Sequence, residues 1–367
     1  MLLGLGLCTS AWSQDPQYTQ FYSNPLFLNP GFAGSSGDAR LSVNYRMQWP
    51  GLDVSYNTYS LSYDHFVASI NSGFGFYISR DDTQTSNASL SNTSTFPGQN
   101  TLPISTTAVS GFYSYLIPLS DKWSIQAGLQ AGFGMRRTDN SFVFESDLIG
   151  GGGSENVIDG SAPRNYFDFS SGAVLYSRTL WVGVSASHIN QPNQSLLVNG
   201  EDQLPMKLSL QAGYRLDLNP VTDKPADRER SIMPVLMYRM QGQSDQMDVG
   251  IYAVFEPLIA GIWYRGIPFK AFDDIQGDSD DIWNANQFRN TDAVAFLLGF
   301  KYKDFSIGYS YDVTTSQIGF ANTAGSHEIS MTYHFSVNSE YDNNRPRYKR
   351  FGRIYCPNPW KSYQKMN

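Results

Sequence analysis

Strict alternation of apolar and polar side chains is the main pattern along this chain. Residues 41–49 (LSVNYRMQW) alternate with period 2, which gives a β-strand one apolar and one polar face and which a helix cannot sort in this way. Residues 123–136 repeat the pattern with a wholly apolar face from Trp123 to Met135. About 9–11 tilted residues suffice for a strand to cross a bilayer. The pattern therefore predicts membrane-crossing strands.

The same reading of the whole chain predicts fourteen such strands and an all-β fold, a transmembrane antiparallel β-barrel. An even number of strands returns both termini to one side, which we expect to be the periplasm. The predicted strands begin near Leu41, Thr58, Gly73, Thr107, Trp123, Phe167, Leu180, Lys207, Ser231, Gln246, Leu258, Val294, Phe305 and Glu328.

The connections between these strands test the count, because outer-membrane barrels have short periplasmic turns and long external loops. Tight turns follow even-numbered strands, at 119–122, 177–179, 256–257 and 303–304. Long links follow odd-numbered strands, at 81–105, 138–165, 191–205 and 267–291. Two links break the rule, a long one at 217–230 and a short one at 241–245. The alternative, a soluble β-sandwich or propeller, would leave many aromatic strand faces without a matching sheet.

Composition agrees with a barrel. Aromatic residues make up 14% of the chain and charged residues only 16%, below the quarter that is usual in soluble domains. No apolar run reaches the 18 residues of a membrane-spanning helix. The net charge of −7 argues against nucleic acid as a partner, since phosphate binding needs a basic surface.

The two ends of the chain differ in composition from the predicted barrel, residues 39–335. An apolar stretch followed by Ala11-Trp12-Ser13 predicts a signal peptide over residues 1–13, with its basic start lying upstream of Met1. Cys8 lies in this peptide, so its removal leaves Cys356 as the only cysteine of the sequence, and no intramolecular disulfide is expected. Residues 336–367 form a basic, aromatic tail that we expect in the periplasm, where a lipoprotein or a peptidoglycan-associated partner would bind it; a solvated tail is the alternative.

Residues 14–38 precede the first strand and are too apolar for a free tail. Tyr18, Phe21 and Phe32 alternate with Asn24-Pro25 and Asn29-Pro30, which favour turns over a strand. A fourteen-stranded barrel is wider than the eight strands that side chains alone can fill. The segment is therefore predicted to plug the barrel, and an extension paired at its rim is the alternative.

The predicted inward faces carry charges of both signs. Seven are basic and five acidic, a balance that favours ion pairs within the lumen over an ion-selective pore. The basic residues are Arg46, Arg136, Lys207, Arg215, Arg239, Arg265 and Lys301. The acidic residues are Asp64, Asp168, Asp248, Asp312 and Glu328.

Candidate catalytic or cofactor-binding groups are sparse. The four histidines lie on separate predicted strands without the spacing of paired metal ligands. A lipase-like pairing of Ser187 with His188 is disfavoured, because adjacent residues of a strand point to opposite faces. The sequence thus predicts no enzyme and no cofactor. The last strand ends in Tyr333 and Phe335, which resembles the terminal signal that outer-membrane assembly machinery reads.

Several stretches resemble the PorP/SprF proteins of the Bacteroidota type IX secretion and gliding systems. The first is Gln14-Asp15-Pro16-Gln17-Tyr18-Thr19-Gln20-Phe21, followed by Asn29-Pro30-Gly31 and Ala33-Gly34. Further matches are Phe169–Ala173, Trp181–Ser185, Asn190-Gln191-Pro192, Gly261–Arg265, Gly308–Asp312 and Gly325–Ile329. Gly31 departs from the alanine that is more frequent in the family, and the basic tail is longer than in a minimal member.

The resemblance implies a non-catalytic outer-membrane protein that contacts lipid and type IX secretion components. An SprF-like member implies secretion and surface attachment of one adhesin with a type B C-terminal domain, and a PorP-like member implies a part of the core apparatus. A general diffusion porin or uptake channel is the other alternative. The predicted external link 267–291 contains an acidic loop, which is expected to attract a basic patch of the cargo. The acidic residues of this loop are Asp273, Asp274, Asp278, Asp280 and Asp281.

Overall fold

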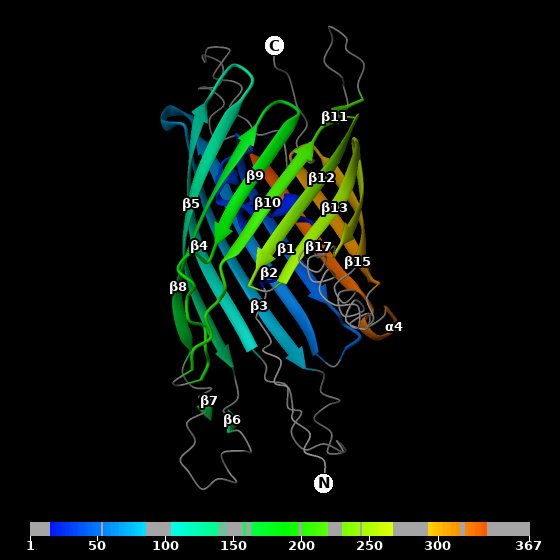
Figure 1. Cartoon of the computed structure of the whole chain (residues 1–367). Coiled ribbons are helices and arrows are strands. Elements are labelled where there is room, and N and C mark those ends of the chain that lie inside the picture. The colour runs from blue at the N-terminus through cyan, green and yellow to red at the C-terminus, as the bar shows by residue number, and fades with distance from the viewer. Residues whose placement is uncertain are drawn as a thin grey trace, which may run out of the picture.

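The computed structural model describes residues 15–52, 54–85, 104–138, 142–143, 157–158, 163–197, 200–218, 230–242, 244–266, 293–315 and 320–335. In these residues one antiparallel sheet of fourteen main strands closes into a barrel (Figure 1). The strands are β1 (Ala39–Gln48), β2 (Val54–Val67), β3 (Ser72–Thr85), β4 (Ile104–Pro118), β5 (Ser124–Thr138), β8 (Arg164–Tyr176), β9 (Leu180–Ser187), β10 (Lys207–Tyr214), β12 (Arg230–Gln241), β13 (Ser244–Phe255), β14 (Leu258–Arg265), β15 (Ala293–Tyr302), β16 (Phe305–Thr314) and β17 (Ser326–Phe335).

Sequential neighbours pair around the wall, and β1 pairs with β17 to close it. The short β11 (Leu216–Asp217) follows β10 and also pairs with β12, while β6 (Phe142–Val143) and β7 (Val157–Ile158) pair with each other outside the barrel. The short helices are η1 (Phe21–Ser23), α1 (Pro25–Leu28), η2 (Pro30–Phe32), η3 (Ala68–Ile70) and α4 (Phe320–Thr323). No helix in the described part of the chain is both long and apolar enough to cross a membrane.

The sequence prediction of fourteen antiparallel strands is confirmed. Each predicted start lies within four residues of the observed one, and the largest difference is at β2, which begins at Val54 rather than Thr58. One boundary has a consequence for the site. The predicted link 81–105 is too long, because β3 continues to Thr85 and β4 begins at Ile104. Asp81 is therefore a wall residue and not a loop residue.

Most short and long connections lie at opposite ends of the barrel. The short-turn rim, at the top of Figure 1, carries the connections 67–72, 118–124, 176–180, 255–258 and 302–305, together with the long connection 217–230 that the sequence also gives as an exception. The long-link rim, at the bottom, carries 85–104, 138–164, 187–207, 265–293 and 314–326, together with the short connections 48–54 and 241–244. Ala39 pairs with Phe335, so the wall begins and ends at the short-turn rim.

The predicted signal peptide and the predicted basic tail lie outside the described residues. The expectation that both termini are periplasmic falls on the same residues and stays a prediction.

The outer surface of the wall is apolar and the alternate residues of many strands point into the lumen. In β1, Leu41 and Val43 are exposed, whereas Ser42 and Asn44 are fully buried. Phe167 and Leu298 are each about two-thirds exposed, at 65% and 67%. A continuous exposed apolar band of this kind requires a hydrocarbon environment, and closed strand pairing satisfies the backbone polar groups there.

We expect this closed pairing to be lost in one cooperative step. An unheated sample in detergent should therefore migrate differently on a denaturing gel from a boiled one, because the folded barrel binds less detergent. Recovery of the chain in the soluble fraction with a helical circular-dichroism spectrum would contradict the barrel.

Candidate functional site in the barrel lumen

Residues 15–38, here called the plug, lie inside the barrel and are drawn in dark blue in Figure 1. Two Asn-Pro pairs break the segment into single turns, because proline is favoured at the first position of a helix and cannot continue a strand ladder. The Asn29 side chain accepts a hydrogen bond from the Gly31 backbone N–H at 2.8 Å, which fixes the second turn. The plug runs from the long-link half of the lumen to β1 at the short-turn rim.

Aromatic side chains anchor the plug to the inner wall. Phe21 packs edge-on against Trp263 with ring centroids 4.7 Å apart, and Phe32 packs against Trp181 at 5.6 Å. Phe21 and Phe32 are almost completely buried. The wall opposite them is apolar although it faces inward, in contrast to the polar inner face that alternation predicts. Its apolar residues include Val174, Tyr176, Met233, Val235, Met237, Tyr252, Val254, Ile259, Ala295 and Leu297.

Glycines in the wall allow the plug backbone to approach closely. A Cβ added at Gly128 would lie 2.3 Å from the carbonyl of Pro30, and one at Gly73 would lie 2.0 Å from the carbonyl oxygen of Ala33. At Gly172 the added atom would lie 2.1 Å from Oδ1 of Asn29. No real Cβ tolerates such distances, so the wall and the plug fit only while these positions lack side chains.

A side chain at Gly128 should therefore displace the plug. We expect Gly128→Val to make the segment around Pro30 accessible to protease in the detergent-solubilised protein, whereas Gly111→Val should not, because nothing lies within 4 Å of an added Cβ there. Limited proteolysis with mass spectrometry of the fragments measures this. Equal protection in both variants would show that the wall glycines do not hold the plug.

The predicted lumen charges Arg46, Asp312 and Glu328 meet around the plug residues Thr19 and Gln20. Arg46 lies 2.7 Å from Asp312 and 3.2 Å from Glu328, and all three side chains are nearly inaccessible to solvent. The Glu328 carboxylate also accepts the backbone N–H groups of Thr19 at 2.7 Å and Gln20 at 3.0 Å. Charge-assisted bonds of this kind are stronger than neutral ones, so this cluster holds the plug to β1, β16 and β17.

The other predicted lumen charges are also paired. Asp64 binds Arg40 at 2.8 Å and accepts the Gly34 backbone N–H at 2.8 Å. Asp248 binds Arg239 at 2.7 Å. Further pairs are Arg265 with Asp312 at 3.3 Å, Arg136 with Asp202 at 3.3 Å, Asp168 with His188 at 2.9 Å, Arg215 with Asp217 at 2.7 Å and Lys301 with Glu256 at 3.9 Å, and Lys207 binds Asp15.

Asp15 and His188 also belong to the site, although the sequence prediction of lumen charges does not include them. The Asp15 carboxylate lies 2.9 Å from Nε2 of His188 and also binds the ammonium of Lys207. Burial opposes ionisation, yet His188 and Lys207 hold the pKa of Asp15 well below its usual range. Burial likewise disfavours a charged imidazole, but Asp15 and Asp168 raise the pKa of His188 to about 9. At neutral pH the start of the plug is thus held by opposite charges.

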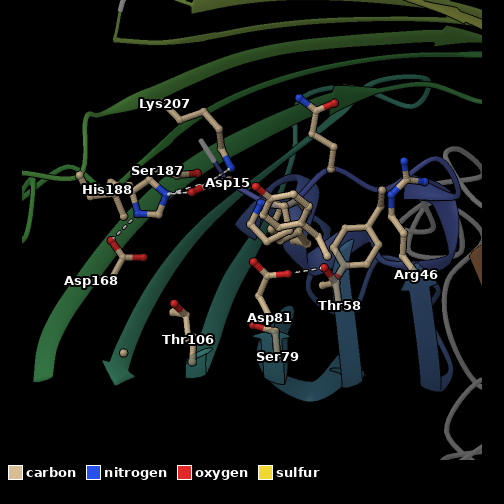
Figure 2. A pocket seen from close by; sticks show the side chains of 18 of the residues that line it. Asp15, Arg46, Thr58, Ser79, Asp81, Thr106, Asp168, Ser187, His188 and Lys207 are labelled. Carbon is tan, nitrogen blue, oxygen red and sulfur yellow. Dashed lines mark hydrogen bonds and ion pairs between the residues drawn. The ribbon is translucent and has the colours of Figure 1, made fainter. Parts of the chain in front are cut away.

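A cavity of about 800 Å³ lies between the plug and the long-link rim. Asp15, Tyr18 and Phe27 contribute to it from the plug, and Trp49 and Thr314 line it at the rim. Figure 2 shows Asp15, Lys207, His188 and Asp168 on one side of this cavity and Asp81 beside Thr58 on the other. In the described residues no group of three His, Cys, Asp or Glu side chains is placed to hold a metal ion.

The other predicted site residues lie as follows. Gln17 donates to Gln246 at 2.8 Å, and the Tyr18 and Tyr77 hydroxyls are 3.2 Å apart. Tyr333 is exposed on the outer face of β17, and Phe335 ends that strand. The acidic loop Asp273–Asp281 lies outside the described residues.

A family model described as "Type IX secretion system membrane protein PorP/SprF" matches residues 10–95 and 95–333. The chain belongs to the PorP/SprF family. This chain is an outer-membrane protein related to type IX secretion. Its family and its closed barrel with an apolar outer surface both support this conclusion. The family resemblance noted in the sequence is thereby confirmed.

Solved structures with a similar architecture are outer-membrane barrels of low sequence identity. The toluene transporter TodX of P. putida is 10% identical, with a TM-score of 0.48 over 84% of this chain and 93% of TodX. A FadL homologue of Pseudomonas aeruginosa is 12% identical, with a TM-score of 0.46 over 85% of this chain and 94% of the homologue. No curated protein matches the sequence at a significant level.

Proposed function

We propose that this member of the PorP/SprF family supports secretion and cell-surface attachment of one type IX cargo, an adhesin with a type B C-terminal domain. Family membership supports a role in type IX secretion. The fixed plug supports the proposal, because a filled lumen favours a barrel that binds a partner over one that conducts solutes.

The contacts of the plug argue against a diffusion channel. Ion pairs fix its beginning through Asp15, a buried carboxylate fixes Thr19 and Gln20, and wall glycines enclose the turn at Pro30. Ser114 and Gln126 both donate to the Ala33 carbonyl, at 2.7 and 2.6 Å. A solute that crossed the barrel would have to break several of these contacts together. A general porin, in contrast, leaves a continuous water-filled path.

The partner is proposed to dock at the long-link rim, with the cargo domain on the external loops and the type IX machinery at the periplasmic tail. The acidic loop Asp273–Asp281 would attract a basic patch on the cargo, and this attraction would weaken at high salt. The tail after Phe335 would reach a periplasmic lipoprotein or a peptidoglycan-associated partner. In this arrangement the cargo binds the external side of the barrel and the secretion machinery binds the periplasmic side, and nothing has to pass through the lumen.

Deletion of the gene is expected to remove one adhesin from the cell surface, and with it spreading on agar, while most other secreted proteins still reach the medium. Quantitative mass spectrometry of the surface and the medium measures both. Complementation with the intact gene is the control. Loss of all secretion would favour a PorP-like core role. Intact surface proteins with reduced uptake of small solutes would favour the channel.

A further inference from the structure

Among the described residues, the acidic side chains that strands turn into the lumen have basic partners, with one exception. Asp64 has Arg40, Asp248 has Arg239, Asp168 has His188, and Asp312 and Glu328 share Arg46. Asp81 of β3 also faces the lumen, but no described basic side chain forms an ion pair with it. An isolated carboxylate in a partly buried site is unfavourable unless a cation compensates it.

Hydroxyl groups flank Asp81, and the basic side chains that line the same cavity are paired with other acids. Arg46 and Arg265 bind Asp312, Arg136 binds Asp202, and His188 and Lys207 bind Asp15. In the sheet register Asp81 lies directly between Thr58 of β2 and Thr106 of β4. The Thr58 hydroxyl donates to the Asp81 carboxylate at 2.5 Å, and the acids Asp82 and Asp15 add negative charge near it. The carboxylate thus keeps acceptor capacity and a negative charge on its open side.

That open side is the cavity between the plug and the long-link rim (Figure 2). Tyr18 and Phe27 of the plug also line this cavity. The Phe27 ring already lies 4.8 Å from the ammonium nitrogen of Lys207, so a plug aromatic accepts a cation over its face. A carboxylate and aromatic rings around one water-accessible space are the groups that recognise an organic cation.

We propose that Asp81 binds the ammonium or guanidinium group of a lysine or arginine side chain, presented by a peptide segment that enters from the long-link rim. The inference rests on the proposed function in one respect, that the segment belongs to the secreted cargo. A volume of about 800 Å³ holds a side chain with a few residues of backbone and not a folded domain.

A metal ion fits this position less well than an organic cation. Among the described residues, three metal-ligating side chains do not come together anywhere in the barrel. Calcium needs six to eight oxygen ligands, several of them carboxylates. A guanidinium or ammonium group needs only one carboxylate together with neighbouring acceptors, which Asp81 and the flanking threonines provide.

The test uses the purified full-length barrel in detergent with arginine amide as the probe and citrulline amide, its neutral near-isostere, as the matched ligand. Binding is measured by isothermal titration calorimetry for the wild type, Asp81→Asn and Asp82→Asn. Asp82 is the adjacent carboxylate, and it bonds Arg80 on the outer side of the same strand. It therefore controls for loss of one negative charge from β3.

We expect arginine amide to bind the wild type and Asp82→Asn equally and to bind Asp81→Asn at least about tenfold more weakly, the effect of one lost charge-assisted contact. Citrulline amide should bind all three proteins as weakly as arginine amide binds Asp81→Asn. Absence of arginine amide binding to the wild type, or equal binding to Asp81→Asn, would overturn the proposal. So would binding of Ca²⁺ that depends on Asp81 and excludes arginine amide.

This outcome is independent of the proposed cargo function. If arginine amide binds through Asp81 while deletion of the gene leaves the surface proteins intact, the cation site stands and the cargo role falls. If the deletion removes one adhesin but arginine amide does not bind to the barrel, the cargo role stands and the cation site falls.

Discussion

Removal of residues 17–32 is expected to convert a closed barrel into a conducting one. These residues carry the aromatic anchors Phe21 and Phe32 and the bonds to Glu328, and their side chains fill the lumen between opposite walls. Fourteen strands enclose more space than the wall side chains alone can fill, so water should enter once the plug is absent. We expect little conductance from the full-length protein in planar bilayers and large, steady steps from the deletion variant.

The control for this experiment is the folded state of the variant. The deletion protein must keep the gel shift between unheated and boiled samples, which shows that its wall is closed. A full-length protein that conducts as strongly as the folded deletion variant would show that the plug does not seal the lumen.

The second large effect is expected from Glu328→Ala. This substitution leaves the buried guanidinium of Arg46 with one acidic partner less and removes the acceptor of two plug backbone N–H groups. Breaking a buried pair from one side typically costs about 3–5 kcal/mol. We expect the free energy of unfolding to fall by about this amount in reversible urea titrations in lipid vesicles.

The matched comparison is Asp202→Ala, which removes the acid of the Arg136–Asp202 pair. Asp202 is 48% exposed in that pair, so its loss should cost about 0–1 kcal/mol. Similar losses in the two variants would mean that the Glu328 cluster does not hold the plug more strongly than a surface ion pair does.

The wall of the barrel could be predicted from the sequence because its physical cause is local. A strand between lipid and lumen must alternate, and the sequence does so throughout β1 and in β5 as far as Arg136. Turn length then sorts the connections between two rims. The same alternation identifies Arg46, Asp312 and Glu328 as inward residues, although it does not reveal which of them meet.

The parts of the site that could not be predicted depend on contacts between distant segments. Asp15 meets His188 and Lys207 across more than 170 positions of sequence, and no local motif marks that contact. Arg40 lies one residue before the predicted start of β1, and Asp81 falls in the predicted link 81–105 because β3 continues beyond the apolar pattern of its sequence. Alternation does not predict the apolar inner wall opposite Phe21, because the side chains of this wall are apolar where they pack against the plug.

The composition of the native complex tests the proposed cargo role directly. The tagged barrel is extracted from outer membranes under mild conditions, purified, and analysed by quantitative mass spectrometry against an untagged strain. We expect one secreted surface protein in near-stoichiometric amount together with type IX secretion components. A barrel that is recovered alone, from cells whose surface adhesins are present and whose secretion is active, would contradict the cargo role.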